Sequence, residues 1–137
     1  MKGIYALVIL VSEDIALAVG ALGEVKFDNG LYVYVGSAQT NLEERIARHL
    51  RKTKRKFWHI DYLLDAEGVN VVKVLYKEAA KAEECRVAVE LGEVGLAIEG
   101  FGSSDCHCES HLFRLPNYEF LKGYMNELSL ELRQQSS

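Results

Sequence analysis

The stretch GLYVYVGSAQTNLEERIARHL, residues 30–50, carries the clearest structural signals in this chain. Its first part follows an Asp-Asn-Gly turn signal and is rich in β-branched and aromatic residues, so it predicts a strand. We expect this strand to break off at Gly36. The pattern T-x-x-E, from Thr40 to Glu43, is typical of a capping box and predicts that a helix begins there. A strand that ends next to a tyrosine therefore runs directly into a helix.

Four other segments have hydrophobic patterns that predict strands or helices. The apolar run IYALVILV, residues 4–11, is typical of a strand buried on both faces, and we expect it to pair antiparallel with residues 31–35. Alternating residues predict a third strand over 69–76, and helices are predicted over 57–64 and 81–91. These elements do not alternate regularly. They predict an α+β fold with a small central antiparallel or mixed sheet of about three strands, flanked by helices.

Length and composition predict a single domain that lies in the cytoplasm and not in a membrane. The 137 residues, 49% of them hydrophobic, predict one domain over 1–137, with a short C-terminal helix and a frayed end within 118–137. No apolar run approaches the roughly 18 residues of a membrane span, so no membrane partner is expected. Three cysteines without a secretory signal pattern predict free thiols in a reducing compartment, and hence a cytoplasmic location.

Basic residues are concentrated in one segment of an otherwise acidic chain. Sixteen basic and twenty acidic residues give a net charge of −4, so an anionic partner must use a local patch. Seven of the basic residues lie within residues 45–56, followed by aromatic rings that could stack on bases. The predicted nucleic-acid contacts, with one later histidine, are Arg48, Arg51, Lys52, Lys54, Arg55, Lys56, Trp58, His59 and His107. The alternative for this segment is a solvated loop, and for the helix before it a solvated face on which Glu44 and Arg48 form an ion pair.

Two tyrosines and two helical side chains are candidates for a phosphate site. If the first two strands pair, Tyr5 of GIY and Tyr34 of YVG become neighbours on one face of the sheet. Arg45 and His49 lie one turn apart on the helix that follows, where Arg45 offers a fixed cation to a phosphate. The alternatives are ordinary packing for the tyrosines and a solvated helix face for Arg45.

The helix over 81–91 supplies a candidate metal ligand. Glu84 lies in its first turn, where a carboxylate is favoured by the helix dipole. If it projects inward instead, it is an oxygen ligand suited to magnesium. Cys85 and Val89 are the residues expected on the inner side of this helix.

The segment SSDCHCESH, residues 103–111, contains residue types that ligate zinc. Cys106, Cys108 and His111, with Cys85 or His107, could form such a site. The spacing C-x-C-x-x-H is not a common zinc signature, so buried free thiols are expected and zinc is the less favoured alternative. In an extended segment both thiols would face the core, and His107 would face solvent or a phosphate.

Taken together, GIY at residues 3–5, YVG at 34–36, an arginine in the next helix and a glutamate in a later helix resemble the GIY-YIG nuclease superfamily. The whole chain is similar to an uncharacterised archaeal branch of it, whose domains are sometimes fused to endonuclease III-like repair glycosylases. The resemblance implies that the tyrosines contact the attacking water and that the arginine stabilises charge on the phosphate. It assigns these roles to Tyr5, which would help deprotonate the water, Tyr34, which would orient it, Arg45, His49, which would support either tyrosine, and Glu84, which would hold Mg²⁺ or Mn²⁺.

The function that this resemblance implies is a divalent-metal-dependent DNA endonuclease or a DNA-repair-associated nuclease, with DNA-repair proteins as further partners. Two alternatives remain open from the sequence. One is a catalytically inactive nucleic-acid-binding module on the same fold, because a fold does not by itself confer an activity. The other is a small zinc-binding structural domain.

Overall fold

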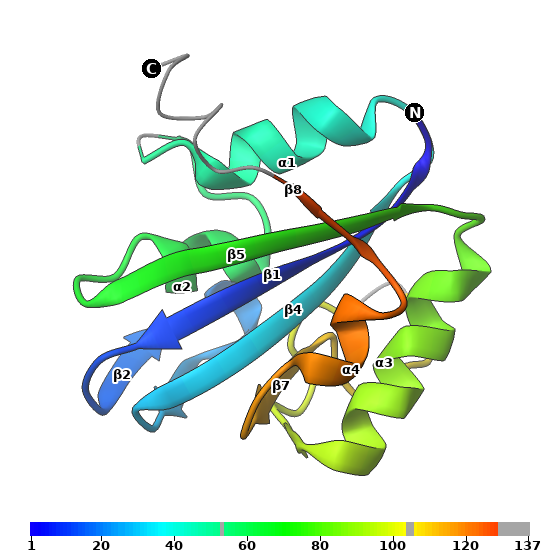
Figure 1. Ribbon diagram of the computed structural model, residues 1–137. Helices are drawn as coiled ribbons and strands as arrows, with labels where there is room; N and C mark the ends of the chain where they lie inside the picture. The colour runs from blue at the N-terminus through cyan, green and yellow to red at the C-terminus, as the bar shows by residue number, and fades with distance from the viewer. Residues whose placement is uncertain (53, 104–105, 129–137) are drawn as a thin grey trace.

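A computed structural model of the chain describes residues 1–52, 54–103 and 106–128. The strands in it are β1 (Gly3–Val11), β2 (Ile15–Ala18), β3 (Glu24–Phe27), β4 (Gly30–Ala38), β5 (Val69–Glu78), β6 (Leu96–Ala97), β7 (Leu112–Leu115) and β8 (Asn126–Leu128). The helices are α1 (Leu42–Leu50), α2 (His59–Leu64), α3 (Ala82–Val94) and α4 (Glu119–Lys122), with a short 3-10 helix η1 (Gly20–Leu22). The fold is α+β (Figure 1).

A six-stranded antiparallel sheet lies at the centre, in the order β6-β7-β4-β1-β5-β8. The sheet is larger than the predicted three strands. The expected pair was correct, since β1 lies antiparallel to β4 with Tyr5 opposite Gly36. The extra strands β6, β7 and β8 have two to four residues each and carry no alternating pattern long enough to identify them from sequence. β2 and β3 pair with each other as a separate ribbon.

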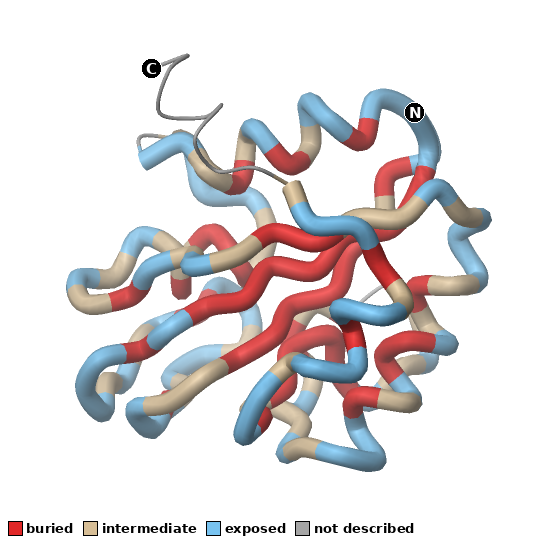
Figure 2. Tube along the Cα trace, in the orientation of Figure 1, coloured by how far each residue is buried: buried red, intermediate tan, exposed pale blue. Residues whose placement is uncertain are grey.

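Two hydrophobic cores cover the two faces of the sheet. Alternate residues of β1 point to opposite faces, so Tyr5 and Leu7 belong to one core and Ile4 and Ala6 to the other. α1, α2 and the β2–β3 ribbon cover the first face, and α3 and α4 cover the second. β1 is buried along nearly its whole length, as the apolar run predicted (Figure 2).

The junction between β4 and α1 differs from the prediction in two ways. β4 does not end at Gly36 but continues to Ala38. The helix cap is Asn41 rather than Thr40: its backbone is left-handed, with φ 51°, and its side chain accepts a hydrogen bond from the amide of Glu44. Asparagine tolerates this conformation and caps as well as threonine does, so it displaces the predicted capping residue.

The C-terminal part is strand as well as helix. α4 covers only Glu119–Lys122, and β8 then pairs with β5. Residues 129–137, the last part of the tail for which a frayed end was predicted, lie outside the described residues. In the part of the chain that the structure describes, no helix is long and apolar enough to cross a membrane.

Candidate active site at the open edge of β4

A pocket of about 300 Å³ lies where β4 approaches α1 and the start of α3. The sheet contributes Tyr5 and Tyr34, and α1 contributes Arg45. The helix α3 contributes Glu84, and Lys81 lies just before it. Further lining residues are Gly36, Ser37, Ala38, Gln39, Trp58, Gly102 and His111. The structure therefore brings Tyr5, Tyr34, Arg45 and Glu84 together although they come from four separate segments.

The register of β7 explains how residues from both faces of the sheet meet here. β7 pairs with β4 only from Leu31 to Tyr34, and the next amide, of Val35, bonds to the carbonyl of His111 at 2.9 Å. Residues 36–38 lie beyond this pairing and line the pocket. The side chain of Glu84, from the helix on the opposite face of the sheet, lines the same pocket as the tyrosines at this open edge.

Gly36 is required by the tyrosine on the neighbouring strand. Tyr5 stands opposite Gly36, and a Cβ atom added there would collide with the Tyr5 phenol. The ring thus crosses the glycine to reach the pocket, at 6.4 Å from the ring of Tyr34. The glycine in YVG serves a close side-chain approach rather than the end of a strand.

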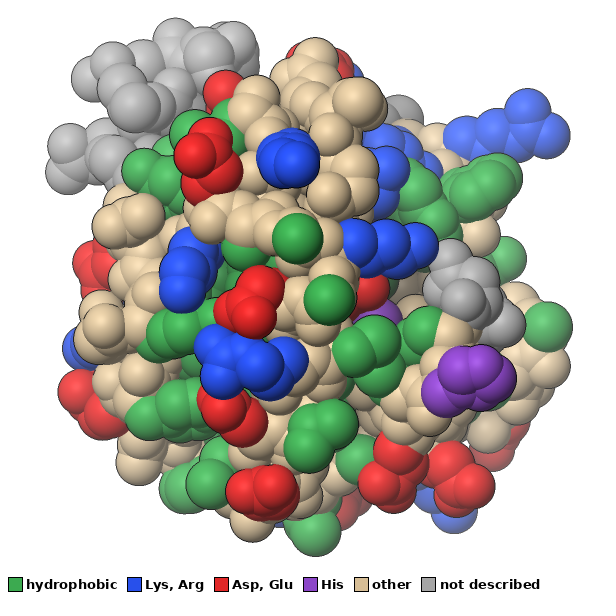
Figure 3. Space-filling model, turned by 90° about the vertical axis from the view of Figure 1, so that its right-hand side faces the viewer, with side chains coloured by type: hydrophobic (Ala, Val, Ile, Leu, Met, Phe, Trp, Pro, Cys, Tyr) green, Lys and Arg blue, Asp and Glu red, His purple; other side chains and the backbone are tan. Residues whose placement is uncertain are grey.

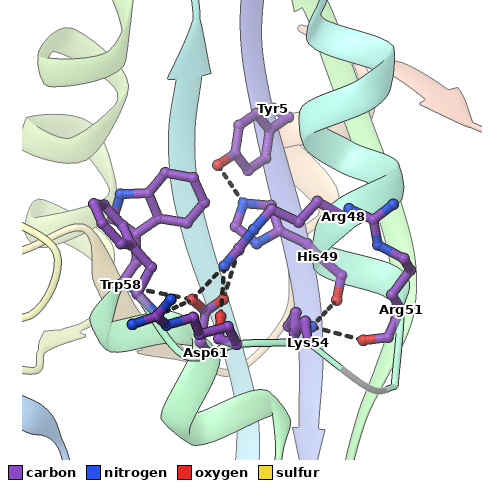
Figure 4. Close-up of polar contacts among 9 residues, drawn as sticks. Tyr5, Arg48, His49, Arg51, Lys54, Trp58 and Asp61 are labelled. Atoms are coloured by element: carbon purple, nitrogen blue, oxygen red, sulfur yellow. Dashed lines mark hydrogen bonds and ion pairs between the residues drawn. The ribbon is translucent and has the colours of Figure 1, made fainter.

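Tyr5 and His49 form a buried hydrogen-bonded pair (Figure 4). The Tyr5 hydroxyl lies 2.6 Å from Nε2 of His49, and both side chains are almost fully buried. Burial lowers the pKa of His49 to about 3, with the neighbouring Lys54 and Arg48 adding to the effect against Asp61. Burial also raises the pKa of Tyr5, although Arg45 opposes the shift. Both groups are therefore neutral at physiological pH.

Tyr34 is a second neutral phenol beside the first. Burial raises its pKa well above the ordinary value, and the neighbouring Tyr5 and Glu84 add to the shift. Its ring packs edge-on against His49 and Phe101. Tyr34 is thus held rigidly at the pocket wall as a hydrogen-bonding group.

Arg45 is fixed in place by two contacts. Its Nη1 atom donates to the carbonyl of Ser37 at 3.1 Å, and its guanidinium lies over the indole of Trp58, 4.6 Å from the ring centre. Such stacking suits a guanidinium, whose planar face is weakly hydrated. A cation is thus held in the pocket lining beside Trp58, whose ring also stacks with the guanidinium of Arg48 at 4.4 Å.

The inner face of α3 differs from the predicted one. Val89 is 60% exposed and Cys85 only half-buried, whereas Glu84 is buried along with Val87, Ala88 and Leu91. The helix is rotated by about one residue from the phase that its sequence pattern suggested. This rotation turns Glu84 toward the pocket, where its Oε2 lies 3.6 Å from Nδ1 of His111.

Two of the predicted nucleic-acid contacts have partners within the protein. Arg48 pairs with the fully buried Asp61 through two hydrogen bonds of 2.9 and 3.0 Å, not with Glu44 (Figure 4). Lys54 donates to the carbonyls of His49 and Arg51 at the end of α1. These cations stabilise the segment between α1 and α2.

Four cations of the same segment are exposed. They are Arg51, Lys52, Arg55 and Lys56. Arg51 and Lys56 also lie near Glu44 and Asp65, in ion pairs at the surface. The segment leads into Trp58, which lines the pocket, but none of these four cations is among the described lining residues.

The two predicted histidine contacts differ from each other. The half-buried His59 accepts a hydrogen bond at Nδ1 from the amide of Gly102, so it joins α2 to the 102–111 loop. His107 is exposed on that loop, as predicted, whereas Cys106 and Cys108, which were expected to face the core, are only half-buried.

The lining also includes residues that sequence patterns did not single out. Lys81 and Ser37 are ordinary surface residue types, and Gln39 lies between strand and helix. His111 was considered only as a zinc ligand. Position in the fold, rather than any local pattern, places these residues at the pocket.

A pH dependence of stability follows from the His49 burial. The unfolded chain takes up a proton at His49 near its ordinary pKa of 6.5, whereas the folded protein resists this until about 3. The unfolded state therefore binds more protons in this window. The contribution of neutral His49 to the free energy of unfolding is fully present above pH 6.5 and decreases as the pH falls. The free energy of unfolding is lower by about 2 kcal/mol at about pH 5 for this reason.

The His49→Gln variant isolates this effect. Its free energy of unfolding, measured by urea denaturation near neutral pH and at about pH 5, is expected to fall by about 2 kcal/mol less than that of the unaltered protein. Losses of equal size in both proteins would contradict the assignment of His49 as a neutral buried group.

The chain matches one protein-family model. Neither a curated protein nor a solved structure matches the chain. A protein-family model does match, over residues 4–134, which includes every residue of the pocket described above. The chain belongs to the family described as Domain of unknown function DUF123.

Proposed function

We propose that this protein is a divalent-metal-dependent DNA endonuclease or a DNA-repair-associated nuclease, as its resemblance to the GIY-YIG nucleases implies. The observation that carries the proposal is the convergence of Tyr5, Tyr34, Arg45 and Glu84 on one pocket. Packing of the core does not require a guanidinium, a carboxylate and two phenols at one edge of a sheet. Phosphodiester hydrolysis does require groups of these kinds.

The positive side chains suit a phosphate. In hydrolysis a water oxygen forms a bond to phosphorus and the bond to the leaving ester oxygen breaks, while negative charge is shared among the phosphate oxygens. Arg45 and Lys81 both line the pocket, so they can stabilise this charge. Figure 3 shows several lysine and arginine side chains toward the upper right of one face, while others lie among acidic side chains over its centre and left.

The two phenols are suited to orienting water. Tyr5 and Tyr34 are neutral because burial raises their pKa values, so neither is a strong base in the free protein. The Tyr5 hydroxyl is held by its hydrogen bond to His49, which fixes the direction of its lone pairs. Orientation of the attacking water is therefore the role that the chemistry of these side chains favours.

Glu84 fits the expected metal. It is the one carboxylate among the described residues that line the pocket. Magnesium is commonly bound by one or two carboxylates, with waters and substrate phosphate oxygens completing the site. A cation bound there would lower the pKa of a bound water and neutralise phosphate charge.

The direct test is a cleavage assay on branched, nicked, damaged and intact DNA, and on RNA, with Mg²⁺, Mn²⁺ or chelator. We expect cleavage of DNA that needs the metal. Binding without cleavage on every substrate would favour the second candidate, the inactive nucleic-acid-binding module. That candidate is supported by the four exposed cations of the segment that leads into Trp58, a residue of the pocket lining.

Binding itself is expected to depend on these cations. In the variant Lys52→Ala/Arg55→Ala, the slope of log binding constant against log salt should fall by about 1.8 in magnitude if each cation contacts one phosphate of duplex DNA. Fluorescence anisotropy at several salt concentrations measures this slope. Lys26→Ala is the control. This exposed lysine lies on β3, just before the first residues of β4, whereas the pocket lies at the last residues of β4. An unchanged slope in the double variant would remove the segment from the binding surface.

A further inference from the structure

Three thiols and an imidazole meet beside the pocket, outside the group of residues that the proposed hydrolysis uses. They are Cys85 on α3 and Cys106, Cys108 and His111 on the loop before β7. One ligand atom of each lies within 4.8 Å of every other, and Cys106 Sγ is 3.3 Å from His111 Nε2. Ligand atoms of a tetrahedral zinc site, with bonds of about 2.0–2.3 Å, lie about 3.5–3.8 Å apart. A small contraction of this cluster would give that geometry.

We propose that Cys85, Cys106, Cys108 and His111 bind one structural zinc ion that joins the loop to α3. Three thiolates and one imidazole are a known structural zinc set. Four protein ligands leave no open position, so the ion has a structural role. The proposal does not depend on the nuclease activity.

The orientation of His111 supports a metal rather than a chance meeting of side chains. Its Nε2 atom faces the cysteines, while Nδ1 faces the Glu84 carboxylate at 3.6 Å. Histidines that ligate metals commonly direct the other ring nitrogen to a carboxylate, which fixes the ring and its tautomer. The imidazole is also buried, so its position is well defined by packing.

The backbone of the loop is already shaped to bring its ligands together. The amide of Gly100 bonds to the carbonyl of Glu109, and the amide of His111 bonds to the carbonyl of Phe101. Gly100 and Gly102 have φ of 76° and 72°, values that favour glycine and let the chain turn back on itself. Phe101 anchors the start of the loop in the core.

The arrangement of α3 links the metal to the pocket. Glu84 and Cys85 are successive residues, so one side chain reaches the pocket and the next reaches the cluster. His111 touches both sites. A zinc ion at the cluster would therefore fix the pocket wall that contains Glu84.

The sequence disfavoured zinc because C-x-C-x-x-H lacks a second cysteine pair. The structure adds the missing ligand from Cys85, twenty-one positions before Cys106 and on another element. The three thiols are all free rather than joined in a disulfide.

Metal analysis of the full chain, without a histidine tag and purified without chelator, tests the proposal. We expect about one zinc ion per chain, and its loss in Cys106→Ser and Cys108→Ser. His107→Ala is the matched control, because this exposed histidine lies between the two cysteines but outside the cluster. It should retain the zinc.

A second measurement applies if the serine variants do not fold. Cobalt added to metal-free protein should give the visible absorption of tetrahedral thiolate coordination, and excess zinc should abolish it. The thiols of the native protein should react with a thiol reagent only after a chelator is added. Zinc-free native protein with three reactive thiols, or stoichiometric iron in place of zinc, would overturn the proposal.

Discussion

Arg45→Ala is expected to lower the rate of metal-dependent DNA cleavage by about 100- to 1,000-fold, the usual cost of removing one group that stabilises charge in the transition state. The Arg45 guanidinium is held in the pocket lining by the Ser37 carbonyl and the Trp58 ring, so alanine removes a cation whose position is fixed. Arg45→Lys should recover only part of the rate, since an ammonium cannot keep both the planar stacking and the forked hydrogen bonds. The measurement is single-turnover cleavage of labelled DNA.

Controls separate this effect from weak binding and from misfolding. Arg51→Ala removes an exposed arginine just past the same helix and should leave the single-turnover rate at saturating protein within a few-fold of normal. Glu84→Gln keeps the shape of the side chain and removes the charge that would bind the metal, so it should abolish the metal-dependent cleavage. If Arg45→Ala or Glu84→Gln cleaved at the normal rate, the pocket would not be the active site.

Asp61→Ala is expected to destabilise the protein by about 3–5 kcal/mol, because it leaves a partly buried guanidinium without its partner. Asp61 is fully buried and accepts hydrogen bonds from Arg48 and from the amides of Phe57 and Trp58. Burial opposes its ionisation, but Arg48 and these two amides outweigh the effect and lower the pKa of Asp61. The carboxylate thus joins the start of α2 to α1.

Urea denaturation near neutral pH measures the effect. Glu44→Gln is the control, since it breaks a solvent-exposed ion pair with Arg51 and should cost less than about 1 kcal/mol. A double variant, Arg48→Met/Asp61→Leu, should regain much of the stability, because a buried ion pair can often be replaced by apolar side chains of similar size. A cost below about 1 kcal/mol for Asp61→Ala would show that the network contributes little.

Secondary structure was predictable where a pattern of residue types extends over many successive positions. The apolar run of β1 and the aromatic strand β4 were identified, and their antiparallel pairing was confirmed. The helix after β4 was also predicted, although its cap is Asn41. Such patterns work because periodicity and capping depend on contacts within a few residues along the chain.

The short strands were not predictable. β6 has two residues and β8 has three, so neither contains enough alternation to indicate a strand. They are strands because neighbouring strands of the sheet offer hydrogen bonds to their backbones. Their existence depends on where the tertiary structure places them.

The candidate site divides in the same way. The sequence by itself determined which residue types were available: two tyrosines at strand positions, an arginine and a glutamate on helices, and a Cys/His-rich loop. Only the tertiary structure decided that Arg48 pairs with Asp61, that Tyr5 meets His49 forty-four positions away, and that Cys85 joins the loop cysteines. The physical reason is the distance along the chain over which each kind of interaction acts. Strand and helix preferences come from sterics between near neighbours, whereas partners across the fold are chosen by packing, by the rotation of α3 and by the open edge of β4.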